Sequence, residues 1–165
     1  MRIILSVLME NEFGALSRVV GLFSQRGYNI NALSVSQTNN IEISRLTLIT
    51  SGSPSVISQI KKQLEKLLNV IDVVDITSLD HTEKQLSLVK LKAADISGIK
   101  LASVIANFNA SIVKSNEKTG YIILQLSSTN SEISSCIDYI GKEHVLEVVS
   151  SGVIGIENSI RHLKE

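Results

Sequence analysis

The sequence predicts an α+β protein made of two domains that share the element order βαββαβ. Apolar residues switch repeatedly between strand spacing, where every second residue is apolar, and helix spacing at i, i+3, i+4 and i+7. The switches follow the same order in both halves of the chain, more faintly in the second. One proline and nine glycines in 165 residues leave few breaks and no low-complexity linker. We therefore expect two domains of about 80 residues each.

The first half begins with a strand and a helix. Residues 2–9 are almost all apolar and predict a buried strand. After a turn, an apolar row predicts a helix, and Gly27 is placed to end it as the C′ residue. This row is Leu16, Val19, Val20 and Phe23. Residues 29–37 and 43–50 then predict two strands, joined by the polar residues 38–40.

A second helix begins at Ser53-Pro54, because serine is a favoured N-cap and proline is favoured at the first helical position. Asn69 closes this helix, and residues 70–77 predict the fourth strand of the first domain. The apolar stripe of the helix is Val56, Ile60, Leu64 and Leu67.

The second half repeats this order. Residues 85–92 alternate as a strand, residues 110–115 and 119–127 predict a hairpin, and residues 144–151 predict a last strand. Two helices are indicated by apolar rows at Leu101, Val104, Ile105 and Phe108 and at Ile133, Cys136, Ile137 and Ile140.

The domain limits follow from the polar stretch at residues 79–83. We expect one domain at residues 1–77 and a second at residues 84–165. The closing strands resemble each other, Val70-Ile71-Asp72-Val73-Val74 against Val145-Leu146-Glu147-Val148-Val149. This similarity indicates either an internal duplication or two amphipathic strands in equivalent places.

Each βαββαβ unit is ferredoxin-like, with one antiparallel sheet and both helices on one face. The other face is expected to be bare. In the first domain it carries Ile4, Ser6, Leu8, Ala32, Ser34 and Ser36. Small and apolar residues are poorly suited to permanent contact with water, and small domains bury a modest share of their surface. We therefore expect at least a homodimer.

Composition excludes several classes of protein. Lys+Arg and Asp+Glu both total 16, so no basic excess favours nucleic acid. An RNA-recognition domain with the same element order needs exposed aromatics on its central strands, and residues 2–9 and 43–50 have none. No stretch approaches the roughly 20 apolar residues of a membrane span. The single cysteine, Cys136, fits a reducing compartment, so we expect a cytoplasmic protein without nucleic-acid or membrane partners.

Residues suited to catalysis or metal binding do not gather in the sequence. His81, His144 and His162 fall in different elements without metal-ligand spacing. The sequence has no GxSxG motif, no Walker loop and no GxGxxG motif. We expect no catalytic residues, no metal site and no cofactor in this chain.

The turn before the first helix is the best candidate for a binding site. Gly14 allows close approach to the backbone, and the amides of Gly14, Ala15 and Leu16 open the helix without partners inside it. Free amides at the positive end of a helix suit a carboxylate, and Asn11 adds a donor and an acceptor. Asn29, at the start of the second strand, could complete the site from another subunit. The alternative is an ordinary strand-to-helix turn in which Asn11 bonds to its own backbone.

The N-terminal stretch resembles a known family. Residues 4–30, ILSVLMENEFGALSRVVGLFSQRGYNI, closely resemble the start of the small subunit of acetolactate synthase, also called acetohydroxyacid synthase. The similarity continues through Ser44-Arg45-Leu46-Thr47 and residues 59–67. In the second half, Leu88-Val89-Lys90 and residues 151–155 also look like that family.

The resemblance implies that the first domain is an ACT domain, a βαββαβ amino-acid sensor. Such small subunits bind the large catalytic subunit, raise its activity and confer feedback inhibition by valine. The resemblance places thiamine diphosphate, magnesium and FAD in the large subunit. It also places valine at a dimer interface of ACT domains. By matching position, the effector-binding residues would be Asn11, Gly14, Ala15 and Leu16 of one subunit with Asn29 and Ile30 of the other.

The second half matches the family more loosely, notably at residues 93–98 and 127–130. Two alternatives therefore stay open. One is a free-standing ACT protein that regulates an unrelated enzyme. The other is an enzyme in its own right, which the absence of a recognisable nucleophile, metal site or cofactor loop disfavours.

Overall fold

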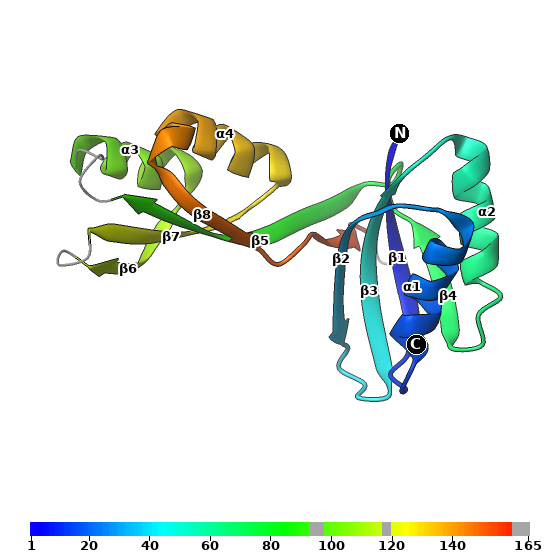
Figure 1. Ribbon diagram of the computed structural model, residues 1–165. Coiled ribbons are helices and arrows are strands. Elements are labelled where there is room, and N and C mark those ends of the chain that lie inside the picture. Colours follow the sequence, from blue (N-terminus) through cyan, green and yellow to red (C-terminus); the bar gives the residue numbers. More distant parts are fainter. Residues whose placement is uncertain (93–97, 117–119, 160–165) are drawn as a thin grey trace. The chain divides into compact units, whose positions relative to one another are not determined.

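A computed structural model describes residues 1–92, 98–116 and 120–159 of the chain (Figure 1). The chain forms two compact units. The first contains Met1–Thr82 together with the segment that begins at Val153, and the second contains Glu83–Gly152. The N-terminal unit thus ends close to the polar stretch at residues 79–83. The expected second domain ran to the end of the chain, whereas the structure groups the segment from Val153 with the first unit.

The first unit has the predicted order βαββαβ (Figure 1). Its antiparallel sheet has the strand order β2-β3-β1-β4. The elements are β1 (Arg2–Glu10), α1 (Ala15–Arg26), β2 (Ile30–Gln37), β3 (Ile43–Ser51), α2 (Pro54–Leu64) and β4 (Val70–Asp75). The predicted helix ends are confirmed at Gly27, which has φ +67° as the C-cap of α1, and at Ser53, whose hydroxyl accepts from the Val56 amide.

The core of this unit lies between the sheet and its two helices. Ala15, Val19 and Phe23, spaced by four, are the buried residues of α1. Val20 was predicted in this row, but it is 37% exposed because it lies one position round the helix from the buried stripe. The buried residues of the cluster are Ile3, Leu5, Val7, Met9, Ala15, Val19, Phe23, Leu46, Leu48, Ile57, Ile60, Leu64 and Val73.

The opposite face of the sheet is not bare, which corrects the prediction. A short strand near the C-terminus, β9 (Ile154–Glu157), belongs to this unit, and Val153 just before it packs with Ile4 and Ile49 in a second apolar cluster. The Gly155 amide donates to Thr47 Oγ1 over 3.3 Å. Ile4, Ser6 and Leu8, three of the residues expected on a bare face, are at most 2% exposed.

The second unit repeats the architecture with the strand order β6-β7-β5-β8. Its core again lies between the sheet and two helices, with Cys136 fully buried as expected for a small apolar residue. The elements are β5 (His81–Lys92), α3 (Gly98–Phe108), β6 (Ser111–Asn116), β7 (Tyr121–Ser128), α4 (Asn130–Ile140), a 3-10 turn (Lys142–His144) and β8 (Val145–Ser150). Residues 93–97, among the less typical family positions, lie outside the described residues.

The two units also share the register of their closing strands. In the first, β1 pairs with β4 and the register shifts between Leu8 and Met9, opposite Asp72. In the second, β5 pairs with β8 and the register shifts between Lys90 and Leu91, opposite Glu147. Both irregularities fall at the same place in the similar segments, which favours duplication over coincidence. Among the helices of the described ranges, none is long and apolar enough to cross a membrane.

Candidate functional site

The turn between β1 and α1 leaves the start of α1 open. Gly14 is the N-cap with φ +84°, and no side chain caps the helix. A Cβ placed on Gly14 would meet no atom within 4 Å, so the space beside it is empty. The Ala15 amide makes only a long bond of 3.2 Å to the carbonyl of Glu12. Ala15 is buried in the core and Leu16 is half-buried, so of these two residues only Leu16 leaves apolar surface accessible at the helix start.

Two other helices whose starts are described are closed by side chains. Ser53 Oγ accepts from the Val56 amide at the start of α2. At the start of α4, Thr129 and Glu132 form a reciprocal capping box. The start of α1, with its free amides and partial positive charge, is therefore open to solvent.

Asn11 is tied to the loop between β2 and β3. Its Nδ2 donates to the Ile41 carbonyl over 2.9 Å, and its Oδ1 accepts from Ser44 Oγ over 3.1 Å. Its backbone amide donates to the Glu42 carbonyl over 2.7 Å. Asn11 therefore shapes the turn, and a single Nδ2 hydrogen is left for a ligand.

Asn69 holds the turn from the other side, although its position in the sequence indicates only the end of a helix. Its Nδ2 donates to Glu10 Oε2 over 2.7 Å and to Glu12 Oε2 over 3.2 Å. Its carbonyl accepts from the Glu10 amide. Asn69 is only 4% exposed, so the bonds between the α2–β4 loop and the turn are protected from water. The sequence did contain a hint of this role. Asn69 stands between apolar residues, directly after Leu68, where a polar side chain is expected to have a hydrogen-bonding partner.

Asn29 and Ile30 lie away from the turn within one protomer. They follow the C-terminal end of α1, and a helix of 12 residues is about 18 Å long. The Asn29 side chain is exposed, and only its carbonyl has a bond, from Thr50 Oγ1. β2 is an edge strand of the sheet. Within one protomer, Asn11, Gly14, Ala15 and Leu16 therefore lie together at the turn, whereas Asn29 and Ile30 lie at the other end of α1.

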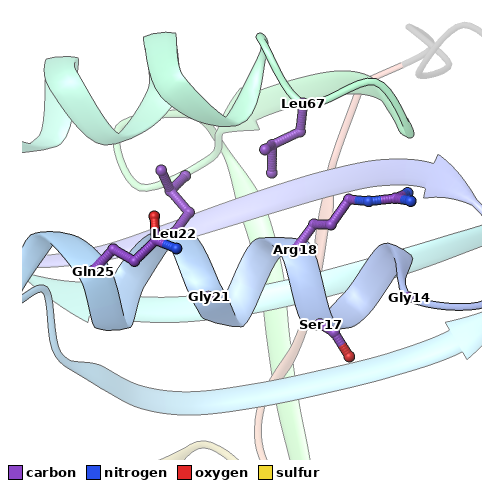
Figure 2. A pocket seen from close by; sticks show the side chains of 7 residues that line it. All are labelled: Gly14, Ser17, Arg18, Gly21, Leu22, Gln25 and Leu67. Atoms are coloured by element: carbon purple, nitrogen blue, oxygen red, sulfur yellow. The ribbon is translucent and has the colours of Figure 1, made fainter.

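A shallow groove of about 530 Å³ runs from Gly14 along the outer side of α1 (Figure 2). Arg18 and Leu22 lie on the side of α1 that faces Leu67, whereas Ser17 points the other way (Figure 2). The groove is lined by Gly14, Ser17, Arg18, Gly21, Leu22, Gln25 and Leu67. The apolar periodicity did not indicate this groove, although Gly14, Ser17 and Gly21 at spacings of three and four form a row without bulky side chains.

Two family models match this chain and together cover most of it. The first is described as "AHAS small subunit-like ACT domain" and matches residues 5–72, the unit that contains the turn. The second is described as "Small subunit of acetolactate synthase" and matches residues 84–159. This second match continues past β8 into the strand that packs on the first unit.

Curated relatives match along almost the whole chain. The acetolactate synthase small subunit of Haemophilus influenzae is 40% identical over 164 residues, which is 99% of each chain. The acetolactate synthase isozyme 3 small subunit of Escherichia coli is 40% identical over 157 residues, 94% of this chain and 95% of the relative. The crystal structure of the Thermotoga maritima small subunit superposes with a TM-score of 0.87 at 24% identity, covering 96% of this chain and 98% of that one.

Proposed function

The chain belongs to the family of acetolactate synthase small subunits, and on this premise we propose that it is a non-catalytic regulatory subunit whose ACT unit senses valine. It binds the large catalytic subunit, raises its activity, and makes that activity subject to feedback inhibition. The open start of α1 is the observation that carries this proposal, because it offers unpartnered amides beside empty space.

The geometry of the turn supports an amino acid as the effector. The effector's carboxylate accepts from the amides at the start of α1, where the helix carries about half a positive charge. Its apolar side chain rests against the accessible part of Leu16, while Ala15 contributes its backbone amide. Asn29 and Ile30 of a second copy close the site across the β2 edge, so the proposed unit of regulation is a homodimer.

Feedback requires that valine bind the inhibited arrangement of the holoenzyme better than the active one. A typical coupling free energy of about 1–3 kcal/mol gives roughly a 5- to 150-fold difference in affinity. The turn is suited to transmit such a difference, because Asn11 and Asn69 join it to the β2–β3 and α2–β4 loops.

The chemistry of the holoenzyme is proposed to lie in the partner. Thiamine diphosphate, magnesium and FAD are held by the catalytic subunit, and this chain contributes binding and control. We place the complex in the cytoplasm. The only cysteine of the chain, Cys136, is a free buried thiol, as is common in a reducing compartment.

Replacing Gly14 with aspartate tests the site. The new carboxylate would enter the empty space beside the helix start and repel the carboxylate of valine, so valine affinity should fall roughly tenfold or more. Aspartate tolerates the left-handed conformation better than most residues, so the fold should persist. Titration calorimetry of valine into the purified protein measures the affinity, and acetolactate formation by the cognate catalytic subunit measures activation.

Gly120→Asp is the matched control. Gly120 has φ +68° and also has empty space beside it, but it lies in the second unit. The Gly120→Asp substitution should leave valine binding unchanged. Unchanged binding in Gly14→Asp would place the effector site elsewhere. A wild-type chain that gives no rise in acetolactate formation would instead indicate an ACT protein that serves another enzyme.

A further inference from the structure

Three apolar side chains protrude from one end of the first unit. Phe13, Leu68 and Ile41 are 104%, 88% and 72% exposed, and apart from Met1 no large apolar side chain among the described residues is more exposed. They come from the β1–α1, α2–β4 and β2–β3 connections, which all lie at the same end of the sheet (Figure 1). We call these three residues the loop-end triad.

Hydrogen bonds hold the three connections together. The Ile41 carbonyl accepts from Asn11, two residues before Phe13. Asn69, next to Leu68, donates to Glu12, the residue before Phe13. The turn that carries Phe13 is thus fixed on both sides. Side chains on a fixed backbone lose less conformational entropy when a partner covers them.

Exposed apolar residues that occur singly are normal on a protein surface, whereas a gathered set of them marks an interaction site. Buried aromatic anchors contribute a large part of the affinity at such sites. Phe13 is the natural anchor here, because its whole side chain is free to enter a pocket.

Charge indicates what kind of surface the triad fits. The three connections carry three exposed carboxylates, Glu12, Glu42 and Glu65, and one exposed lysine, Lys66, so this end is acidic. Two copies meeting face to face through these connections would bring like charges together, which disfavours self-association through the triad itself. The homodimer proposed above joins its copies across the β2 edge instead. An apolar pocket with a basic rim on a different chain fits better.

We propose that the loop-end triad docks into an apolar, basic-rimmed pocket of the catalytic subunit. This inference rests on the proposed function, since it names the surface through which that partner is bound. It also places docking and effector binding on one turn, because Phe13 is the neighbour of Gly14. A change in the turn on valine binding then acts directly on the contact with the catalytic subunit.

The test is a triple variant, Phe13→Ser with Ile41→Ser and Leu68→Ser. Because these side chains are exposed, the thermal unfolding midpoint should stay close to that of the wild type. Binding to the purified cognate catalytic subunit is measured by biolayer interferometry, and the dissociation constant should rise at least tenfold. The control is Leu86→Ser with Val149→Ser and Ile154→Ser, which removes three other exposed apolar residues and should leave the constant unchanged.

Each outcome separates this inference from the proposed function. If the wild type binds and the triple variant binds equally well, the docking surface is elsewhere while the proposed function stands. If the wild type does not bind the catalytic subunit, both fail. Sedimentation analysis of the isolated chain tests whether the triad instead contacts a second copy of this chain. A triple variant that loses self-association while keeping its affinity for the catalytic subunit would assign the triad to a second copy and overturn the proposal.

Discussion

The two units of this protein share the order and pairing of their strands, but they differ in how far the residues of those strands are buried. In both units the four strands of the βαββαβ order are arranged in the same sequence, with the same register shift in the closing strand, and β9 additionally pairs with β5. In the first unit, Val73 on that strand is 2% exposed. The equivalent Val148 of the second unit is 41% exposed. The same strand order therefore does not determine how deeply equivalent residues are buried.

The sheet faces opposite the helices also differ in burial, with the first unit again the more buried. In the first unit, the segment with Val153 and Gly155 packs over Ile4 and Thr47. In the second unit, Leu88 and its cross-strand partner Val149 are 39% and 56% exposed. The unit that carries the candidate effector turn is thus covered on one face of its sheet and over part of the other, while Ser36 on β2 stays exposed.

The helix starts show the reverse difference, because here the second unit is the one with the satisfied hydrogen bonds. The second unit closes α4 with Thr129 and Glu132, whereas the first unit leaves α1 open at Gly14. The better-packed unit therefore leaves one local feature unsatisfied, the uncapped start of α1. Such a feature in a rigid setting is typical of a binding site.

The largest expected difference between the units concerns the aromatic residue of each first helix. Phe23→Ala should cost about 3–5 kcal/mol of stability, because Phe23 is 1% exposed in the first core. Phe108→Ala should cost less, about 1–2 kcal/mol, because Phe108 is only partly buried and packs at the edge of the second core. Urea unfolding monitored by circular dichroism compares the two. Equal losses would mean that the cores are equally well packed.

A smaller loss of stability is expected from displacing β9, the strand that packs on the sheet of the first unit. A Cβ on Gly155 would lie 2.8 Å from Ile76 Cδ1, so Gly155→Val should cost about 1–3 kcal/mol through overpacking. The neighbouring change Ile154→Ala, at a residue 58% exposed, should cost far less. Hydrogen exchange of the Thr47 and Ile4 amides should rise only in the first variant. Equal protection in both would show that β9 contributes little to the first unit.

The smallest effect concerns the helix caps. Thr129→Ala removes the acceptor for the Glu132 amide and should cost about 1 kcal/mol. Ser53→Ala, at the start of α2 in the first unit, should cost a similar amount. Thermal unfolding by calorimetry measures both. A loss near zero at Thr129 would mean that the capping box is not formed in solution.

Most of the fold could be predicted because it follows from local periodicity. The apolar rows and the signals at Gly27 and Ser53 place the elements to within a few residues. The strand β9 could not be predicted in this way. It has four residues, and its contacts with Thr47 and Ile76 depend on chain folding over long separations. For the same reason the outer face was wrongly expected to be bare.

The candidate site was predictable in part. Gly14 before an apolar helix indicates an open helix start, which local geometry decides. The bonds from Asn11 to Ile41 and from Asn69 to Glu12 join segments about 30 and 57 residues apart, and no spacing rule reveals them. Whether Asn29 completes the site depends on a second copy, which the pattern of one chain does not encode.

The central claim is that the turn at Gly14 is the control input of a catalytic subunit. The most direct measurement is acetolactate formation by that subunit, with wild-type or Gly14→Asp chain, with and without valine. We expect both chains to raise the rate, and valine to lower it only in the mixture with the wild type. Equal inhibition of both mixtures by valine would contradict the account.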